Sequence, residues 1–262
     1  MNVYKTSQVR NVVFLGHGGA GKTTLAEAMA YATGVITRMG SVDNGNTISD
    51  YDSEEIKRKF SINAAVIPIE WNGLKINILD APGYFDFVGQ TEDAMSVADA
   101  AVIVVNGKAG LEVGTIKAWE ICERRKIPRI FFITGMDDPN AKYMETVKQL
   151  KETFGKQIAP FHLPIIEDGI LTGYVNVVKM GGRKFVGDNG EYVERDIPDN
   201  LESDLIPCRE QLMEAVAESD EELMDKYFSG EEFSNEEISK ALRKSVISCD
   251  IVPVQIGAGI NC

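Results

Sequence analysis

A short glycine-rich loop, residues 16 to 23, limits the fold of this chain more than any other feature. It reads Gly-His-Gly-Gly-Ala-Gly-Lys-Thr and matches the pattern G-x-x-x-x-G-K-[ST]. Residues 11 to 15 before it are a short apolar run typical of a buried strand, and the leucine, methionine and alanine residues after Lys22 predict a helix ending near Gly34. A strand, a glycine loop and a helix in this order open an α/β fold.

The residue types in this loop suit the phosphates of a nucleotide. Its glycines let backbone N–H groups turn inward around phosphate oxygens. Lys22 is expected to bridge the β- and γ-phosphates, and the Thr23 hydroxyl is expected to be a ligand of Mg²⁺. His17 is assigned no chemistry of its own, because a loop histidine can simply pack.

After the loop the sequence keeps alternating between apolar strands and helices. Strands are expected at residues 62–71, 74–79, 100–106 and 129–134, and helices at 91–99, 113–125 and 140–154, following a polar stretch at 38–59. Asn72-Gly73 between the first two strands is a strong hairpin signal. The alternation predicts an α/β fold of the P-loop NTPase class, with a mainly parallel sheet and helices on both faces.

From about residue 158 the pattern changes. Residues 160–166, 170–179 and 183–194 indicate short antiparallel strands, and helices follow from residue 201 through residue 244. Only residues 250–256 return to the apolar strand pattern of the first part. The sequence therefore predicts a domain of residues 1–157 plus 249–262, interrupted by an α+β insertion at residues 158–248.

Composition excludes several classes of protein. Of the 262 residues, 44% are hydrophobic and 26% charged, which is close to ordinary globular values and excludes disorder and fibres. The longest apolar stretch, residues 100–105, is far shorter than a membrane span, and no leader precedes the glycine loop. The four cysteines and two histidines have no zinc-site spacing. We expect a soluble cytoplasmic protein.

Negative charge is concentrated in one segment. The net charge is −13, and residues 210–237 hold eleven carboxylates against one lysine, a net −10. Repulsion from phosphates makes this segment a poor ligand of nucleic acid. A solvated helix face is the simplest interpretation of such a composition.

A second motif, Asp80-Ala81-Pro82-Gly83, follows the predicted strand at 74–79. Downstream of a phosphate loop it predicts a sensor of metal and γ-phosphate, with Asp80 directed toward Mg²⁺ and the Gly83 N–H toward the phosphate. Ser61, after the polar stretch, would add a second hydroxyl ligand of Mg²⁺. The alternative for Ser61 is an ordinary serine at the start of a strand.

Asp137 follows the predicted strand at 129–134. A carboxylate there would accept two hydrogen bonds from guanine, whereas adenine offers no such donor pair. A helix N-cap is an equally good interpretation of the same aspartate.

Together these residues resemble the GTP-binding domain of the translational GTPases, and among them the elongation factor G family. Residues 16–24 are similar to the family's G-H-x-D-A-G-K-T-T, residues 80–87 to D-T-P-G-H-V-D-F, and Asp137 falls on the aspartate of N-K-M-D. Stretches of the insertion at 173–180 and 221–230 are similar as well. The resemblance covers nearly the whole chain. Because family members carry further domains, it implies an N-terminal fragment that ends just after a fifth motif.

The resemblance implies a GTP hydrolase that binds GTP or GDP with Mg²⁺ and acts on the ribosome in translation. Lys22, Gly83 and Tyr84 are the implied catalytic residues, and Thr23, Ser61 and Asp80 the implied metal ligands. The acidic segment is expected to bind the ribosomal stalk protein, and contacts with membranes or DNA are not expected. The implied nucleotide-binding residues are Gly16, His17, Gly18, Gly19, Ala20, Gly21, Lys22, Thr23, Thr24, Asp80, Ala81, Pro82, Gly83, Tyr84, Thr134, Gly135, Met136, Asp137, Gly257, Ala258 and Gly259.

Several positions depart from the family pattern. Gly19 stands for an aspartate of the phosphate loop, and Ala258 and Gly259 stand for serine and alanine in the fifth motif. Thr134 and Gly135 replace the asparagine and lysine of N-K-M-D, which predicts loose guanine binding.

Tyr84 stands where the family has the histidine that positions the attacking water. A phenol does not become a cation at neutral pH, so weak hydrolysis is expected. A nucleotide-switched binding module with slow or dispensable hydrolysis, and a ribosome-protection factor, remain alternatives. Packing of Tyr84 against a neighbouring helix is the simpler explanation for this residue.

Overall fold

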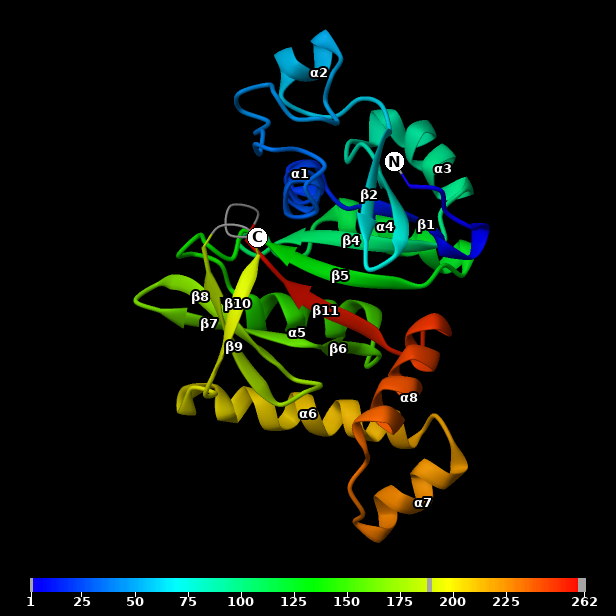
Figure 1. Cartoon of the computed structure of the whole chain (residues 1–262), viewed down its shortest axis with the longest axis vertical. Coiled ribbons are helices and arrows are strands. Elements are labelled where there is room, and N and C mark those ends of the chain that lie inside the picture. The colour runs from blue at the N-terminus through cyan, green and yellow to red at the C-terminus, as the bar shows by residue number, and fades with distance from the viewer. Residues whose placement is uncertain (1, 188–189, 259–262) are drawn as a thin grey trace.

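Seven strands form the central sheet of the computed structural model, which describes residues 2–187 and 190–258 (Figure 1). Across the sheet the order is β2 (Ala65–Trp71), β3 (Leu74–Asp80), β1 (Val9–Leu15), β4 (Ala100–Asn106), β5 (Arg129–Thr134), β11 (Val252–Ile256) and β6 (Ile158–Pro160). All neighbouring pairs are parallel except the hairpin of β2 and β3. The loops that follow β1, β3, β5 and β11 therefore meet at one edge of the sheet.

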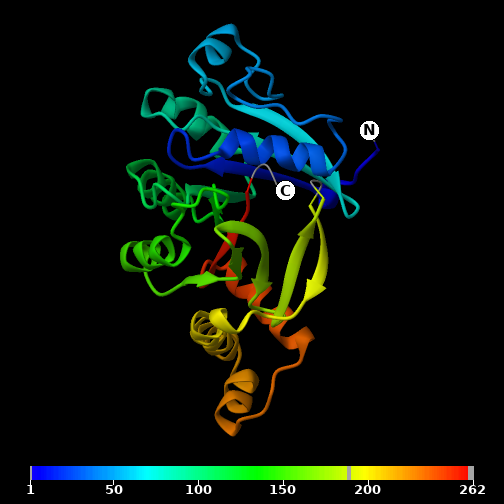
Figure 2. The same ribbon diagram turned by 90° about the vertical axis from the view of Figure 1, so that its left-hand side faces the viewer.

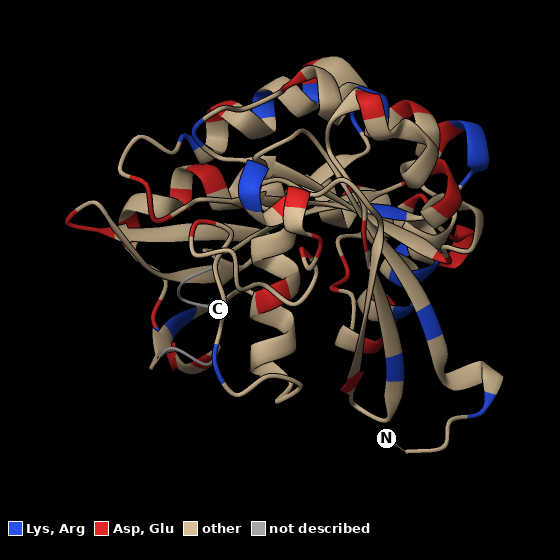
Figure 3. Cartoon of the chain, turned by 90° about the horizontal axis from the view of Figure 1, so that it is seen from above, with Lys and Arg blue, Asp and Glu red and all other residues tan. Residues whose placement is uncertain are grey.

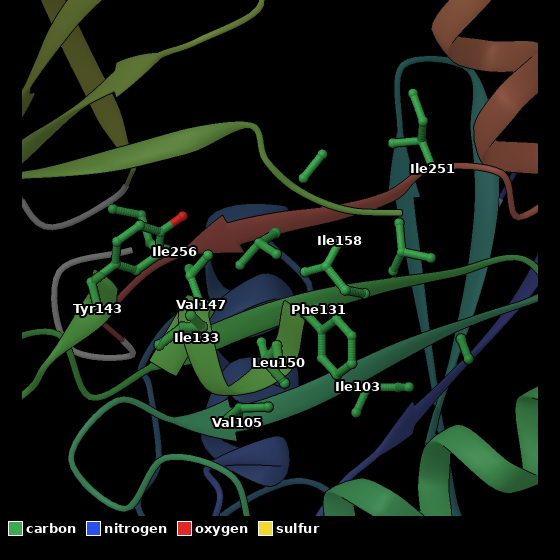
Figure 4. Packing of buried hydrophobic residues seen from close by; sticks show 14 of the residues in the cluster. Ile103, Val105, Phe131, Ile133, Tyr143, Val147, Leu150, Ile158, Ile251 and Ile256 are labelled. Carbon is green, nitrogen blue, oxygen red and sulfur yellow. The ribbon is translucent and has the colours of Figure 1, made fainter. Parts of the chain in front are cut away.

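Helices cover both faces of this sheet. On one face α1 (Lys22–Ala32) packs through Leu25 and Ala26 against Phe14 of β1 and Ile78 of β3. The other face carries α3 (Val88–Ser96), α4 (Val113–Arg125) and α5 (Tyr143–Phe154) (Figure 2). Figure 4 shows α5 against β5 on that face. Because helices cover both faces of the sheet, the residues of β4 are apolar almost throughout.

A second, antiparallel sheet lies beside the central one. Its order is β10 (Glu191–Arg195), β9 (Gly181–Val186), β8 (Ile170–Asn176) and β7 (His162–Glu167). Three helices complete this part, α6 (Glu202–Ala217), α7 (Glu221–Ser229) and α8 (Asn235–Ile247), and α8 leads back to β11 (Figure 1). Leu212 of α6 and Leu242 of α8 belong to the same apolar cluster as α5. One core thus joins the two parts.

Two buried glutamates hold the stretch between α1 and β2. Glu27 of α1 accepts the backbone N–H of Gly40 at 2.8 Å and of Ile48 at 3.0 Å. Glu55, in the short helix α2 (Ser53–Arg58), accepts the N–H of Ile62 at 2.9 Å. A buried carboxylate is stable only when such donors satisfy it. These hydrogen bonds tie the polar stretch to α1 and to the residues just before β2.

The predicted fold class is confirmed, a mostly parallel α/β sheet with an α+β insertion. The prediction missed α2, the short strand β6, and three single-turn helices, η1 (Thr6–Gln8), η2 (Phe85–Phe87) and η3 (Asp199–Leu201). Division into residues 1–157 plus 249–262 and an insertion at 158–248 stays a prediction, and β6 belongs to the larger sheet. Within the described residues no helix is long and apolar enough to cross a membrane.

Candidate functional site

The glycine loop between β1 and α1 is held by the strands beside it. Gly16 lies against the carbonyl oxygen of Val104 in β4, so closely that a Cβ would collide with it. Gly21 has φ +91°, in the left-handed region that favours glycine, and is the N-cap of α1. The Thr134 hydroxyl donates to the carbonyl of Ala20 at 2.6 Å. A hydroxyl thus joins β5 to the loop, although the asparagine that the family pattern has at this position is absent.

Lys22 lies at the inner end of this loop. Its Nζ donates to the carbonyl oxygens of Gly16 at 3.1 Å and His17 at 2.9 Å. Burial lowers the pKa of Lys22 to about 8, although the charge of Asp80 opposes that shift. The ammonium group is therefore held inside the loop, next to the first turn of α1.

Two hydroxyls and two carboxylates lie beside Lys22. The Thr23 hydroxyl donates to Asp80 Oδ2 at 2.7 Å and lies 3.2 Å from Ser61 Oγ. Burial raises the pKa of Asp80 to about 6, against the hydrogen bond from Thr23. Burial also raises the pKa of Asp50, against a hydrogen bond with Ser61. The predicted metal ligands Thr23, Ser61 and Asp80 are therefore adjacent, and Asp50 joins them.

The sequence did not single out Asp50, because it lies in the polar stretch and matches no motif. Its place becomes visible only when the chain folds back over α1. Two buried oxygens in this group, Asp50 Oδ2 and Asp80 Oδ1, have no hydrogen-bond partner. Buried carboxylate oxygens without a donor are a feature of sites that bind a cation.

The loop after β3 lies directly on the glycine loop. A Cβ on Gly83 would lie 2.7 Å from the backbone nitrogen of Gly18 and would collide with Lys22 Nζ. The Tyr84 ring covers Gly18, where a Cβ would lie 2.8 Å from it. The same ring packs on Phe60, with the centroids 4.7 Å apart. Tyr84 thus contacts the glycine loop and Phe60, rather than only a neighbouring helix.

His17 has a structural contact. Its Nδ1 accepts the backbone N–H of Gly114 at 3.3 Å, and its Nε2 lies 3.5 Å from Glu112. These contacts join the glycine loop to the start of α4.

The loops after β5 and β11 meet at the other end of the site. The Gly257 N–H donates to the carbonyl of Ile133 at 3.1 Å, which brings the two loops together. Gly135, Asp137, Gly257 and Ala258 line one end of a cavity of about 630 Å³. The Asp137 side chain is exposed. Met136 is buried in the core, and Gly259 lies outside the described residues.

This cavity continues past the loops along α1. Met29 of α1, Phe132 of β5, and Tyr174 and Phe185 of the second sheet also line it. Among the described residues, no lysine lines this cavity, and most of the side chains that line it are apolar.

Comparison with known proteins agrees with this geometry. Residues 7–261 match the family model described as elongation factor Tu GTP binding domain. The chain belongs to this family. It is 37% identical over 252 residues to elongation factor G of Thermotoga maritima and, at the same level, to that of Thermotoga petrophila. A crystal structure of a Thermus thermophilus protein superposes with a TM-score of 0.89 at 36% identity and covers 97% of this chain.

This GTP-binding domain is only part of the length of its relatives. The match covers 96% of this chain but 36% of the Thermotoga maritima protein, and 38% of the Thermus thermophilus chain. The resemblance to elongation factor G is confirmed as homology.

The residues beside Lys22 fit the Mg²⁺ typical of this GTP-binding family. Magnesium prefers oxygen ligands. Hydroxyl oxygens come from Thr23 and Ser61, and carboxylate oxygens from Asp50 and Asp80. One oxygen of each carboxylate has no hydrogen-bond partner. No cluster of three or more His, Cys, Asp and Glu that would hold a metal occurs within residues 2–187 and 190–258. An ion here would need the hydroxyl oxygens of Thr23 and Ser61 besides the carboxylates.

We expect Asp50→Ala to weaken nucleotide binding only when Mg²⁺ is present. Removing a carboxylate that supports a metal site typically costs 10- to 100-fold in metal affinity, so an increase in Kd of about 10-fold is expected. Titration with GDP in Mg²⁺ and in EDTA measures this difference. Asp43→Ala, an exposed residue of the same stretch, is the control. Equal weakening in EDTA would contradict a role at the metal.

Proposed function

We propose that this chain is the GTP-binding and GTP-hydrolysing domain of a translation factor that acts on the ribosome during elongation. The observation that carries the proposal is the meeting of Thr23, Ser61 and Asp80 beside the buried Lys22. Homology to elongation factor G supports the ribosome as partner and the cytoplasm as location. Most contacts with the ribosome are proposed for other domains of the whole factor, because this chain spans about a third of the length of its relatives.

The proposed roles follow the positions of the residues. Backbone N–H groups of residues 16–24 bind the phosphates, and Lys22 compensates their charge. Asp137 accepts hydrogen bonds from guanine, while the backbone of residues 134–136, 257 and 258 borders the base. Magnesium, when bound, neutralises charge that develops on the phosphates during hydrolysis. Thr23, Ser61 and Asp80 hold it, supported by Asp50.

Hydrolysis depends on the loop after β3. Gly83 donates its backbone N–H toward the terminal phosphate, and the Tyr84 hydroxyl orients the attacking water. A phenol holds water by hydrogen bonds but supplies no positive charge, in contrast to a histidine. Slow hydrolysis is therefore part of the proposal.

Tyr84 also favours a second candidate, a nucleotide-operated binding module in which hydrolysis is slow or dispensable. In such a module the nucleotide sets the arrangement of residues 38–64 and 80–84, and partners respond to that arrangement. A ribosome-protection factor would differ from both in domains outside this chain. Rates of hydrolysis separate the first two candidates.

The acidic segment 210–237 is the proposed contact with the ribosomal stalk protein. It includes the second half of α6, all of α7 and the start of α8, with a net charge of −10. Figure 3 views the end of the molecule away from α7, where acidic and basic residues are interspersed. Phe228 of α7 is 81% exposed and offers an apolar contact within the acidic surface. Membrane and DNA contacts are not part of the proposal.

We expect the protein to bind GTP and GDP in preference to ATP, and Asp137→Asn to remove that preference. Hydrogen bonds to a charged carboxylate contribute about 1.5–3 kcal/mol, so GDP affinity should fall roughly 10- to 100-fold. Calorimetric titration with GDP, GTP and ATP measures both effects. Asp93→Asn on α3 is the control. Equal affinity for ATP and GTP in the unchanged protein would refute guanine recognition.

We expect Tyr84→His to raise ribosome-stimulated GTP hydrolysis by about 100-fold in the full-length protein. An imidazole orients the attacking water as a phenol does, and it can also carry a positive charge. Tyr84→Phe should lower the rate below that of the unchanged protein. Single-turnover hydrolysis with ribosomes measures all three rates, with Tyr51→His as the control for an added histidine. Three indistinguishable rates would leave Tyr84 with a packing role only.

We expect reversal of Glu221, Glu222 and Asp225 to lysine to slow association with ribosomes at low salt. All three side chains are exposed on α7. Electrostatic steering acts on association rates and is screened by salt, so the difference should shrink as salt rises. Stopped-flow association at two salt concentrations measures it. The matched control reverses three acidic residues exposed on α3 and α5, Asp93, Glu145 and Glu152. Equal slowing by both sets of substitutions would indicate that the acidic residues of α7 are only a solvated face.

A further inference from the structure

Asn106 ends strand β4, directly beside the position at which this chain lacks the asparagine of the family pattern. In the pairing of β4 with β5, Asn106 is the partner of Thr134. Paired residues of neighbouring strands direct their side chains to the same face of a sheet. Asn106 and Thr134 both line the cavity that Asp137 also lines. An amide is therefore present at this cavity, one strand away from position 134.

The Thr134 hydroxyl has no hydrogen atom to offer to a base. It donates to the carbonyl oxygen of Ala20 at 2.6 Å and also lies 3.2 Å from that of Val105. A hydroxyl has a single hydrogen to donate. Thr134 thus keeps a contact with the glycine loop but leaves the base without a side-chain donor from this position.

A turn after β4 fixes the orientation of the Asn106 amide. Its Oδ1 accepts the backbone N–H of Lys108 at 3.0 Å and of Ala109 at 3.2 Å. Because the oxygen takes these donors, the nitrogen Nδ2 points the other way, and a Cβ on Gly135 would lie 3.3 Å from it. Among residues 2–187 and 190–258, no group accepts a hydrogen bond from this nitrogen. Two N–H donors are therefore available beside Gly135.

Such a donor suits one edge of guanine and opposes the same edge of adenine. Guanine presents the acceptors O6 and N7 there, whereas adenine has an amino group in place of O6. An amide N–H opposite O6 therefore forms a hydrogen bond with guanine and meets another donor in adenine. The carboxylate of Asp137, in contrast, suits the N1–H and the amino group of guanine.

We propose that Asn106 is a specificity-determining residue for guanine, with Nδ2 donating to the edge of the base that carries O6 and N7. The proposal rests on the proposed function, because it assumes that guanine lies in the cavity beside Asp137. Asn106 then supplies from β4 an amide that is absent from β5. Two side chains from neighbouring strands recognise two edges of one base.

Asn106→Asp tests this role, because a carboxylate still accepts the N–H groups of the turn but has no N–H to donate. In the full-length protein we expect GDP affinity to fall roughly 10- to 100-fold, since a donor is lost and a carboxylate faces O6. Inosine diphosphate should lose affinity by the same factor, because its base keeps O6 and N7 and lacks only the amino group. ADP affinity should not fall. Calorimetric titration measures GDP and inosine diphosphate, and displacement of bound GDP measures ADP.

Asn176→Asp is the matched control. Asn176 also ends a strand, β8, and its Oδ1 accepts the backbone N–H of Lys179 at 2.8 Å, but it does not line the cavity. The role of Asn106 is refuted if inosine diphosphate escapes the loss, if ADP affinity falls as much as GDP affinity, or if Asn176→Asp has the same effect. Unchanged GDP affinity in Asn106→Asp would overturn this role alone. Failure of the unchanged protein to bind GDP would overturn the proposed function as well.

Discussion

An excess of buried negative charge beside the glycine loop is the constraint on which the site depends. Asp50, Asp80 and Lys22 are 4%, 1% and 6% exposed, so two carboxylates share one ammonium group. Charges removed from water are costly unless they are paired. The pKa of both carboxyls is accordingly raised, and that of Lys22 lowered. A divalent cation would restore the balance, which links metal binding to the stability of the surrounding loops.

The sequence predicted those features that arise from local pattern. Strands such as β4 are continuous apolar runs, and the loop from Gly16 to Thr23 has a fixed spacing, so both can be recognised without tertiary contacts. Helix α2 escaped prediction because it is only six residues long and is stabilised by its capping box and by Glu55. Short polar helices carry no periodic apolar face to detect.

Parts of the site depend on residues that are distant in sequence, and these could not be predicted. Asp50 and Glu27 acquire their roles when residues 40–50 fold back on α1. The contact of Thr134 with Ala20 spans more than a hundred residues, so the sequence shows the missing asparagine but not the hydroxyl that contacts the loop. Substitution in a motif shows which group is missing, but only the fold shows which group replaces it.

Tyr84 joins segments that lie far apart in the sequence. Its ring lies on Gly18 of the glycine loop and on Phe60, and the residue before it, Gly83, lies against Lys22 Nζ. A cavity of about 200 Å³ remains between these residues and Ser61. A movement of residues 80–84 would therefore change the surroundings of Lys22 and of Ser61 together.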